Sequence, residues 1–351
     1  MKKIFSYSIV LIILFSCKRE NKEFLGPAFI SASNGFVVNS FTGSPSPVDF
    51  TLTSVYFNAS FSNSVTWKLT IMGNESCAKK DFVGISNSVI NLEWKGTHDG
   101  VYFFKKGETV TATLTFFGTT YTSVLNILIS KPRNFTTYGQ FPLIGDFENP
   151  LLVEPQPPLY SPYWASFNYP TPIANVNQGC DSAAVDYNGN LVPSVQGKKY
   201  YFIKGKGAQA AFVSGIQYFG ALTPVMPADP DNVWVNIYIY GTGDANAGVE
   251  LEYQEADFDG TQSGYQGTDD DAFTAKFSLG HKGWKLFSFK YSSLTPSLNA
   301  PFGGSGNKKH EPEKLISFDL VLVKKLNPTA SIEVYFDYPI ITVGGPFNPS
   351  K

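Results

Sequence analysis

Hydrophobic and polar residues alternate with a period of two along much of this chain, most clearly over residues 233–240. The valines and isoleucines of this segment occupy every second position, so they share one face of a predicted β-strand. The opposite face carries Trp234, Asn236, Tyr238 and Tyr240. Aromatic rings two residues apart form a flat surface with polar edges, which suits the rings and hydroxyls of a sugar chain. The alternative is that both sheet faces are covered and the aromatics are a second layer of core.

The same alternation recurs in short segments between residues 27 and 131, separated by turn residues. The clearest segments are 65–71, 89–94, 109–117 and 122–129. No amphipathic helical stretch of three turns is found. Aromatic residues make up 15% of the chain, charged residues only 16%, and Gly plus Pro total 54 (31 + 23). This composition is typical of β-sandwiches with many turns, so we predict an all-β protein.

Residues 27–131 are predicted to form the first domain. The order of Trp67, Trp94-Lys95-Gly96 and the segment 103–108 resembles the Ig-like modules of flagellar hook-capping proteins, although the usual tyrosine of the final turn is missing. The resemblance implies an Ig-like β-sandwich with both tryptophans in its core. No catalytic motif is evident here, so we expect a spacer. His98 lies in a predicted loop, and we expect it, like His281 and His310, to be exposed.

We predict that residues 132–142 form a linker and that a second domain begins at residue 143. The opening Asp146-Phe147-Glu148, the later Gly283-Trp284-Lys285 and the closing segment 332–337 occur in an order that resembles the galactose-binding-like jelly roll of carbohydrate-binding modules. The resemblance implies a jelly-roll β-sandwich over residues 143–351.

The same resemblance implies a structural calcium between the first and last strands of the jelly roll. The matching positions are Asp146, Glu148 and Asp337. Carboxylate oxygens are the ligands that calcium prefers, and a cation would offset the repulsion between two acidic strands. The alternative is that Asp146 and Glu148 are solvated acids on either side of a core phenylalanine.

A second polar surface is predicted from residues 250–255. Glu250, Glu252 and Gln254 share one strand face. We expect them to lie beside the aromatic face and to bind sugar hydroxyls. With Glu255, the spacing mimics the Glu-x-Asp-x-x-Glu strand of retaining jelly-roll glycosidases, and an enzyme using Glu250 and Glu255 is the alternative. However, Glu255 falls on the other face unless a bulge redirects it, so we favour binding without cleavage.

The N-terminal sequence indicates that the protein is exported. A basic start and a short apolar run end at Ser16-Cys17, which resembles a bacterial lipobox. By this resemblance residues 1–16 are a signal peptide, Cys17 is lipidated and residues 17–26 form a tether to the outer membrane. Besides Cys17 the chain has Cys77 and Cys180, which we place in different domains and do not expect to be paired.

Charge excludes one class of partner. A net charge of −2 and a pI near 6.0 give no basic surface for nucleic acid. Together, the predicted anchor, spacer and jelly roll resemble the surface glycan-binding lipoproteins that Bacteroidota place beside outer-membrane sugar importers. The expected partners are therefore a polysaccharide or oligosaccharide, the outer membrane and an importer. The alternative is a structural or adhesion lipoprotein without a sugar ligand.

Overall fold

The computed structural model describes most of the chain after residue 29, with several gaps. The described residues are 30–135, 145, 147–148, 163–167, 176–206, 212–219, 226–255, 271–297, 307–324 and 331–351. Within these ranges the regular elements are β-strands and two short 3₁₀ turns, η3 (Tyr291–Ser293) and η4 (Pro312–Lys314). The prediction of an all-β fold is confirmed.

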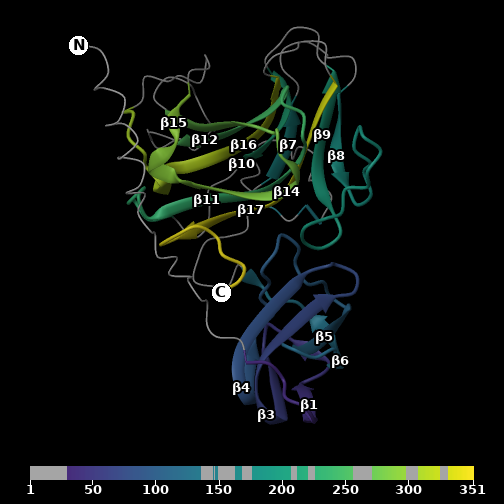
Figure 1. Ribbon diagram of the computed structural model, residues 1–351. Coiled ribbons are helices and arrows are strands. Elements are labelled where there is room, and N and C mark those ends of the chain that lie inside the picture. Colours follow the sequence, from purple (N-terminus) through teal and green to yellow (C-terminus); the bar gives the residue numbers. More distant parts are fainter. Residues whose placement is uncertain are drawn as a thin grey trace, which may run out of the picture.

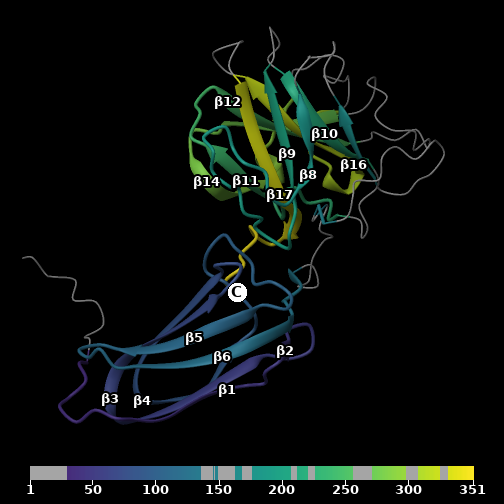
Figure 2. The same ribbon diagram turned by 90° about the vertical axis from the view of Figure 1, so that its right-hand side faces the viewer.

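The strands fall into two groups along the chain (Figure 1). The first group contains β1 (Val38–Ser44), β2 (Val48–Asp49), β3 (Val55–Gly73), β4 (Lys79–Trp94), β5 (Thr109–Phe116) and β6 (Thr122–Lys131). All six strands belong to one sheet, in which the first half of β3 pairs with β1 and its second half pairs with β5. Figure 2 shows that this group is elongated along β3 and β5.

Aromatic residues fill the core of the first group. Trp94 is fully buried, and its ring meets Phe50 at 4.7 Å and Phe104 at 5.0 Å between centroids. Trp67 is also buried, and Gly84 gives it room, because a Cβ at Gly84 would lie 2.3 Å from the indole. The prediction that both tryptophans are core residues is confirmed.

The second group is a sandwich of two antiparallel sheets. We call one the distal sheet, which contains β7 (Tyr163–Phe167), β10 (Phe212–Phe219), β12 (Ala247–Glu255), β13 (Asp271–Ser278), β15 (Thr295–Pro296) and β16 (Leu315–Lys324). We call the other the proximal sheet, which contains β8 (Asn177–Asp181), β9 (Tyr200–Lys206), β11 (Val233–Thr242), β14 (Lys282–Lys290) and β17 (Ser331–Val343). Alternate apolar residues of both sheets, among them Ile237 and Leu251, form the core between them.

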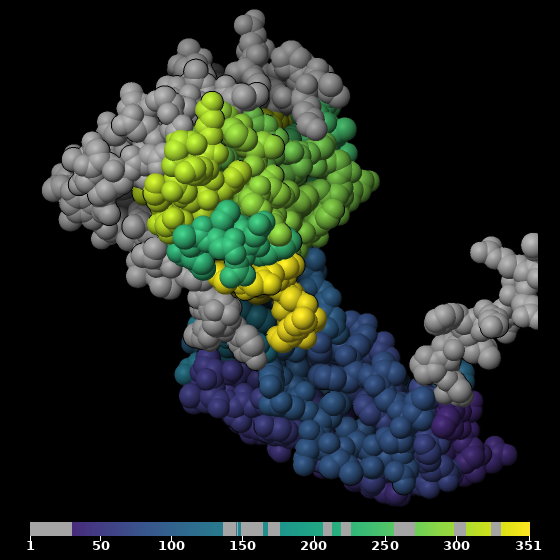
Figure 3. Space-filling view, turned by 90° about the vertical axis from the view of Figure 1, so that its left-hand side faces the viewer, coloured from purple at the N-terminus to yellow at the C-terminus, as the bar shows by residue number. Residues whose placement is uncertain are grey.

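The proximal sheet is the one that faces the first group of strands, and the distal sheet lies beyond it (Figure 1). The junction is held by backbone bonds, in which Phe103 N donates to Val195 O (2.9 Å) and His98 N donates to Pro349 O (3.1 Å). The last residues of the chain lie between the two groups (Figure 3), where Lys80 Nζ donates to Ser350 O (3.2 Å).

His98 corrects one prediction. We expected a solvent-exposed loop histidine, but its side chain is fully buried at the junction. Its ring centroid lies 4.3 Å from that of Phe103 and 5.6 Å from that of Phe135, and its Nε2 has no hydrogen-bond partner within the described ranges. The loop is buried because the C-terminal segment crosses it.

Three predictions about the termini and cysteines have different outcomes. The predicted signal peptide, tether and Cys17 lie outside the described residues. No helix in the described ranges is long and apolar enough to cross a membrane. Cys77 and Cys180 are not joined by a disulfide.

Candidate functional site

The aromatic face of β11 lies at the junction with the first group of strands. Tyr238 is 1% exposed and belongs to a cluster with Phe103 and Phe347. Its ring centroid lies 5.7 Å from that of Phe103. Burial raises the pKa of the Tyr238 hydroxyl. This side chain cannot stack on a sugar while the junction is closed.

Asn236 on the same face is occupied by the C-terminal segment. Its Oδ1 accepts from Phe347 N (2.9 Å), and its Nδ2 donates to Ile340 O (3.1 Å) and Thr342 Oγ1 (3.0 Å). The amide is 3% exposed, so nearly all of its hydrogen-bonding capacity is used inside the protein. Asn236 therefore holds the turn after β17.

Trp234 and Tyr240 are half-buried at the two ends of this strand face. Tyr240 packs edge-to-face against Trp284 (5.6 Å) and Tyr335 (5.4 Å), and its hydroxyl donates to Asp186 Oδ2 (3.4 Å). For the middle of the strand, the second interpretation of the pattern holds: both faces of the proximal sheet are covered, and the aromatics form a second layer.

Glu250, Glu252 and Gln254 do share a face, opposite core Leu251, as the alternation indicated. The prediction that they lie beside the aromatic face is wrong. Strand β12 pairs with β13 and β16 in the distal sheet, whereas β11 pairs with β14 and β17 in the proximal sheet. The two sets of side chains therefore point away from opposite sides of the sandwich, with the core between them.

The outward side of the distal sheet carries a set of polar residues that we call the amide–carboxylate face. It consists of Gln217, Glu250, Glu252, Gln254, Thr274, Lys276, Ser317 and Asp319. Strand register sets them side by side, because Gln217 on β10 is opposite Asp319 on β16, and Asp319 is opposite Glu252 on β12. Cross-strand neighbours on one face are close enough for direct contact.

Gln254 is the centre of the hydrogen bonds on this face. Its Nε2 donates to Glu252 Oε1 (3.1 Å) and Asp319 Oδ2 (3.2 Å), and its Oε1 accepts from Gln217 Nε2 (3.2 Å). Gln217 Nε2 also donates to Ser317 Oγ (2.8 Å). A donor chain therefore runs from Gln217 through Gln254 to two carboxyl groups, which fixes the positions of all four side chains.

The carboxyl groups of this face are buried although they lie outside the core. Asp319 is 6% exposed and Glu252 is 5% exposed. Burial, followed by the charge of Glu252, raises the pKa of Asp319 well above its usual range, and burial also raises the pKa of Glu252. Asp319 Oδ1 has no hydrogen-bond partner among the described residues. A buried polar atom without a partner is costly, so it marks a position where a ligand hydroxyl would be stabilising.

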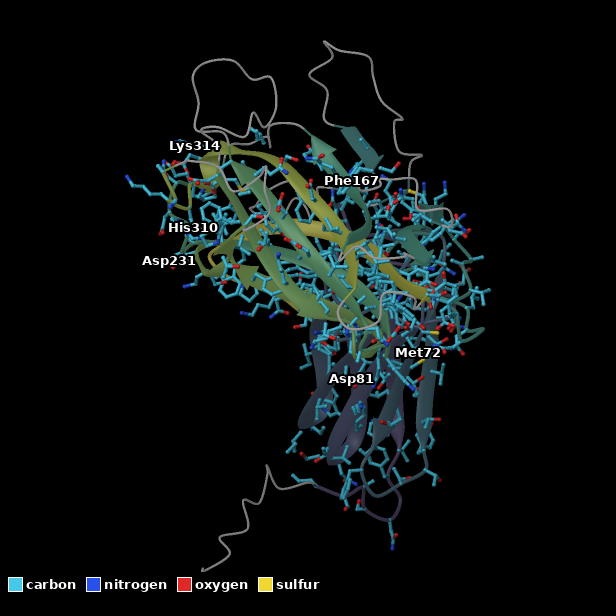
Figure 4. All side chains as sticks on the ribbon, turned by 90° about the horizontal axis from the view of Figure 1, so that it is seen from above. Met72, Asp81, Phe167, Asp231, His310 and Lys314 are labelled. Atoms are coloured by element: carbon cyan, nitrogen blue, oxygen red, sulfur yellow. The ribbon has the colours of Figure 1, made fainter. Side chains whose placement is uncertain are left out.

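Charged and aromatic groups border the face. Glu250 is nearly fully buried and forms an ion pair with Lys276 (2.8 Å), while Ser297 Oγ donates to Glu252 Oε2 (2.9 Å). At the β7 edge, the half-buried ring of Phe167 lies over Gly215, where a Cβ would come within 2.3 Å of it. Figure 4 shows Phe167 at this edge, away from His310 and Lys314.

Glu255 does not join Glu250 and Glu252. A bulge in the pairing with β16 follows Gln254, and Glu255 Oε1 accepts from Tyr291 Oη (2.7 Å) and Glu311 N (2.9 Å). Burial raises the pKa of Glu255 to about 8. Alternation along β12 places Glu255 on the same side as Leu251 and Tyr253, where it meets buried Tyr291, away from the amide–carboxylate face.

The predicted calcium ligands lie partly outside the described residues, because Asp146 is not among them. Glu148 and Asp337 hold opposite ends of one loop: Glu148 Oε1 accepts from Lys198 N (2.6 Å) and Lys199 N (2.8 Å), and Asp337 Oδ2 accepts from Val195 N (2.9 Å). The described residues contain no group of three or more His, Cys, Asp or Glu that could hold a metal.

One atom still fits a cation. Asp337 Oδ1 is buried and has no hydrogen-bond partner in the part of the chain that the structure describes. Burial raises the pKa of this carboxyl, and the charge of Glu148 raises it further. Glu148 and Asp337 would be the described ligands of a calcium here, with oxygen donors of the kind that calcium takes.

Gln217, Ser317 and Asp319 were not identified as site residues from the sequence. A signal was present, because Ser317 and Asp319 alternate with Phe318 and Leu320 in the same way that Glu252 and Gln254 alternate with Leu251 and Tyr253. What the sequence does not contain is the strand order, which places β10 and β16 next to β12.

Comparisons with known proteins give low similarity. No protein-family model matches the chain, and no curated protein does. Among solved structures, a family 11 carbohydrate-binding module from Clostridium thermocellum, in complex with a β-1,3-1,4-mixed-linked tetrasaccharide, is 14% identical over 58% of this chain and 96% of its own, with a TM-score of 0.38. SGBP-B from a complex xyloglucan utilization locus in Bacteroides uniformis is 16% identical over 88% of this chain and 72% of its own, with a TM-score of 0.30. Scores below 0.5 do not establish a function for this chain.

Proposed function

We propose that this protein binds a polysaccharide or oligosaccharide, without cleaving it, at the amide–carboxylate face of the distal sheet. The observation that carries the proposal is the buried, unpartnered Oδ1 of Asp319 in the middle of an ordered row of amide and carboxyl groups. Such a row lies outside the hydrophobic core, so packing between the two sheets does not account for it.

The chemistry of the face suits sugar hydroxyls. A hydroxyl both donates and accepts, and neighbouring sugar hydroxyls pair well with side chains that offer two polar atoms. Gln217 is half-buried, and its carbonyl accepts no hydrogen bond from the described residues, so it is available as an acceptor beside Asp319. Phe167 at the edge offers a flat ring for stacking on a sugar.

The cellular role that we propose combines this site with the sequence. Lipidation at Cys17 would anchor the protein in the outer membrane, with the first group of strands as a spacer and the glycan passed to an importer. In this arrangement the distal sheet is the one turned away from the spacer (Figure 1).

The second candidate function is that of a glycosidase, because the spacing of Glu250 and Glu255 mimics that of retaining jelly-roll glycosidases. A retaining mechanism needs two carboxyl groups about 5–5.5 Å apart on the two sides of one glycosidic bond. Glu255 is instead bound by Tyr291 and the Glu311 amide. We therefore propose capture as the function.

A glycan array with the full chain tests the proposal. We expect binding to a defined set of saccharides, and loss of most of the affinity in Gln217→Ala and Asp319→Ala. Asp231→Ala is the matched control, because Asp231 is an exposed carboxylate whose partners are Lys290 and Ser292. If no saccharide binds, or if both site variants bind as well as the wild type, the proposal is wrong. Release of reducing ends that Glu250→Gln abolishes would instead establish the glycosidase.

A further inference from the structure

The charges of the amide–carboxylate face limit the class of saccharide that it can hold. Glu250, Glu252 and Asp319 lie on two adjacent strands, with Asp319 and Glu252 directly opposite one another. The face as defined has one cation, Lys276, and its ammonium is already paired with Glu250 at 2.8 Å. A negatively charged ligand would therefore approach carboxyl groups, and the Lys276 ammonium would not be free to pair with it.

The buried environment strengthens this effect. Glu250, Glu252 and Asp319 are all less than 10% exposed, so water screens their charges poorly. Gln254 donates both of its bonds to Glu252 and Asp319, which holds the two carboxyl groups close together. Their repulsion is relieved when Asp319 keeps its proton, and its raised pKa agrees with this.

A protonated Asp319 is a neutral group that both donates and accepts. Its Oδ2 is held by Gln254, and its Oδ1 has no partner. This free atom is the second observation that points to a ligand, beside the cluster of acids itself. It can exchange hydrogen bonds with a hydroxyl, but a sugar carboxylate or sulfate would bring a second negative charge to the same position.

The direct connection between two neighbouring strands of this face, β12 and β13, carries no positive charge in the sequence. The segment 256–270, which connects β12 to β13, contains four aspartates and neither lysine nor arginine. Recognition of sulfate or carboxylate groups normally uses arginine or lysine, because these cations match the geometry of the anion.

We propose that the site selects uncharged saccharide chains and excludes polyanionic ones such as uronate or sulfated polymers. This inference rests on the proposed function, because it names the ligand class of the same face. Glu250 sets the selectivity: it neutralises Lys276, which would otherwise attract anions to the site.

Affinity electrophoresis of the full chain tests this selectivity. The neutral probes are barley β-glucan, galactomannan and starch, the anionic probes are alginate, polygalacturonate and chondroitin sulfate, and chitosan serves as a cationic probe. We expect at least one neutral probe to retard the protein, and the anionic probes to bind at least about tenfold more weakly at low salt, where like-charge repulsion is least screened.

Glu250→Gln removes one charge and releases the Lys276 ammonium. We expect this variant to raise anionic binding relative to neutral binding by about fivefold or more, since the freed cation now attracts the ligand. Asp231→Asn, which removes one exposed carboxylate elsewhere, should leave the ratio unchanged. The ratio is the readout, so a general loss of affinity in Glu250→Gln does not mimic the result.

The two proposals fail in different ways. Anionic probes that bind as tightly as neutral ones, or a ratio that Glu250→Gln does not change, would overturn the selectivity while leaving saccharide binding intact. Preference for chitosan over all neutral probes would also overturn it and assign a cationic ligand. Failure of every probe to bind would refute the proposed function and this inference together.

Discussion

Truncating Tyr238 to alanine separates a ligand-binding role for the aromatic strand face from a role at the junction. The side chain is 1% exposed and packs against Phe103 from the first group of strands. Removing a buried aromatic ring costs about 3–5 kcal/mol, since the transfer free energy is lost and a cavity remains. For a unit of this size each kcal/mol lowers the melting temperature by about 2–4 °C, so we expect Tyr238→Ala to melt about 6–20 °C lower.

Calorimetry of the full chain measures the effect, with saccharide affinity measured on the same variant at a temperature where it is folded. Tyr238→Phe is the matched control, because it keeps the ring and removes only the hydroxyl. We expect it to stay within about 1.5 kcal/mol of the wild type, the upper end of the usual contribution of a single hydrogen bond.

Saccharide affinity should be unchanged in Tyr238→Ala, because the amide–carboxylate face lies on the other sheet. The opposite result would refute this reasoning. If Tyr238→Ala melts like the wild type but no longer binds saccharide, the aromatic face is the binding site and the junction is not closed in solution.

Three further predictions concern pH, metal and anchoring. Burial lowers the pKa of His98 to about 4, so between about pH 6.5 and 4 the unfolded chain binds a proton that the folded chain does not bind, and stability should fall as the pH drops through this range. His98→Gln should flatten this part of the plot of stability against pH. A profile that the variant leaves unchanged would contradict the burial of His98. If calcium binds at Glu148 and Asp337, a chelator should lower the melting temperature of the wild type, since a ligand at 100 times its dissociation constant contributes about 2.7 kcal/mol; an unchanged melt with no metal in elemental analysis would leave both residues as loop braces. Cys17→Ser should release the protein from membrane fractions, and normal retention without an acyl chain on wild-type Cys17 would refute the lipoprotein hypothesis.

The fold class was predictable because strand alternation is a local property. The segments 109–117 and 122–129 became the hairpin of β5 and β6, and the segment 233–240 lies within β11. Opposite faces were also correctly separated within β12, where Glu252 points outward and Leu251 points into the core. A period of two is enough to decide which residues share a side.

The position of the site was not predictable in the same way. Alternation does not say which strands are neighbours, so nothing in the sequence placed β12 in a different sheet from β11. The burial of Tyr238 depends on Phe103 and Phe347, which come from distant parts of the chain. Likewise, the partners of Glu255, the Tyr291 hydroxyl and the Glu311 amide, come from segments distant in the sequence.

A crystal structure of the full chain with its saccharide bound tests the central claim most directly. We predict density for sugar rings on the distal sheet, with hydroxyls within hydrogen-bonding distance of Asp319 Oδ1 and Gln217 and a ring against Phe167. Density for the saccharide on the proximal sheet, at Trp234 and Tyr240, with the amide–carboxylate face empty, would contradict the account.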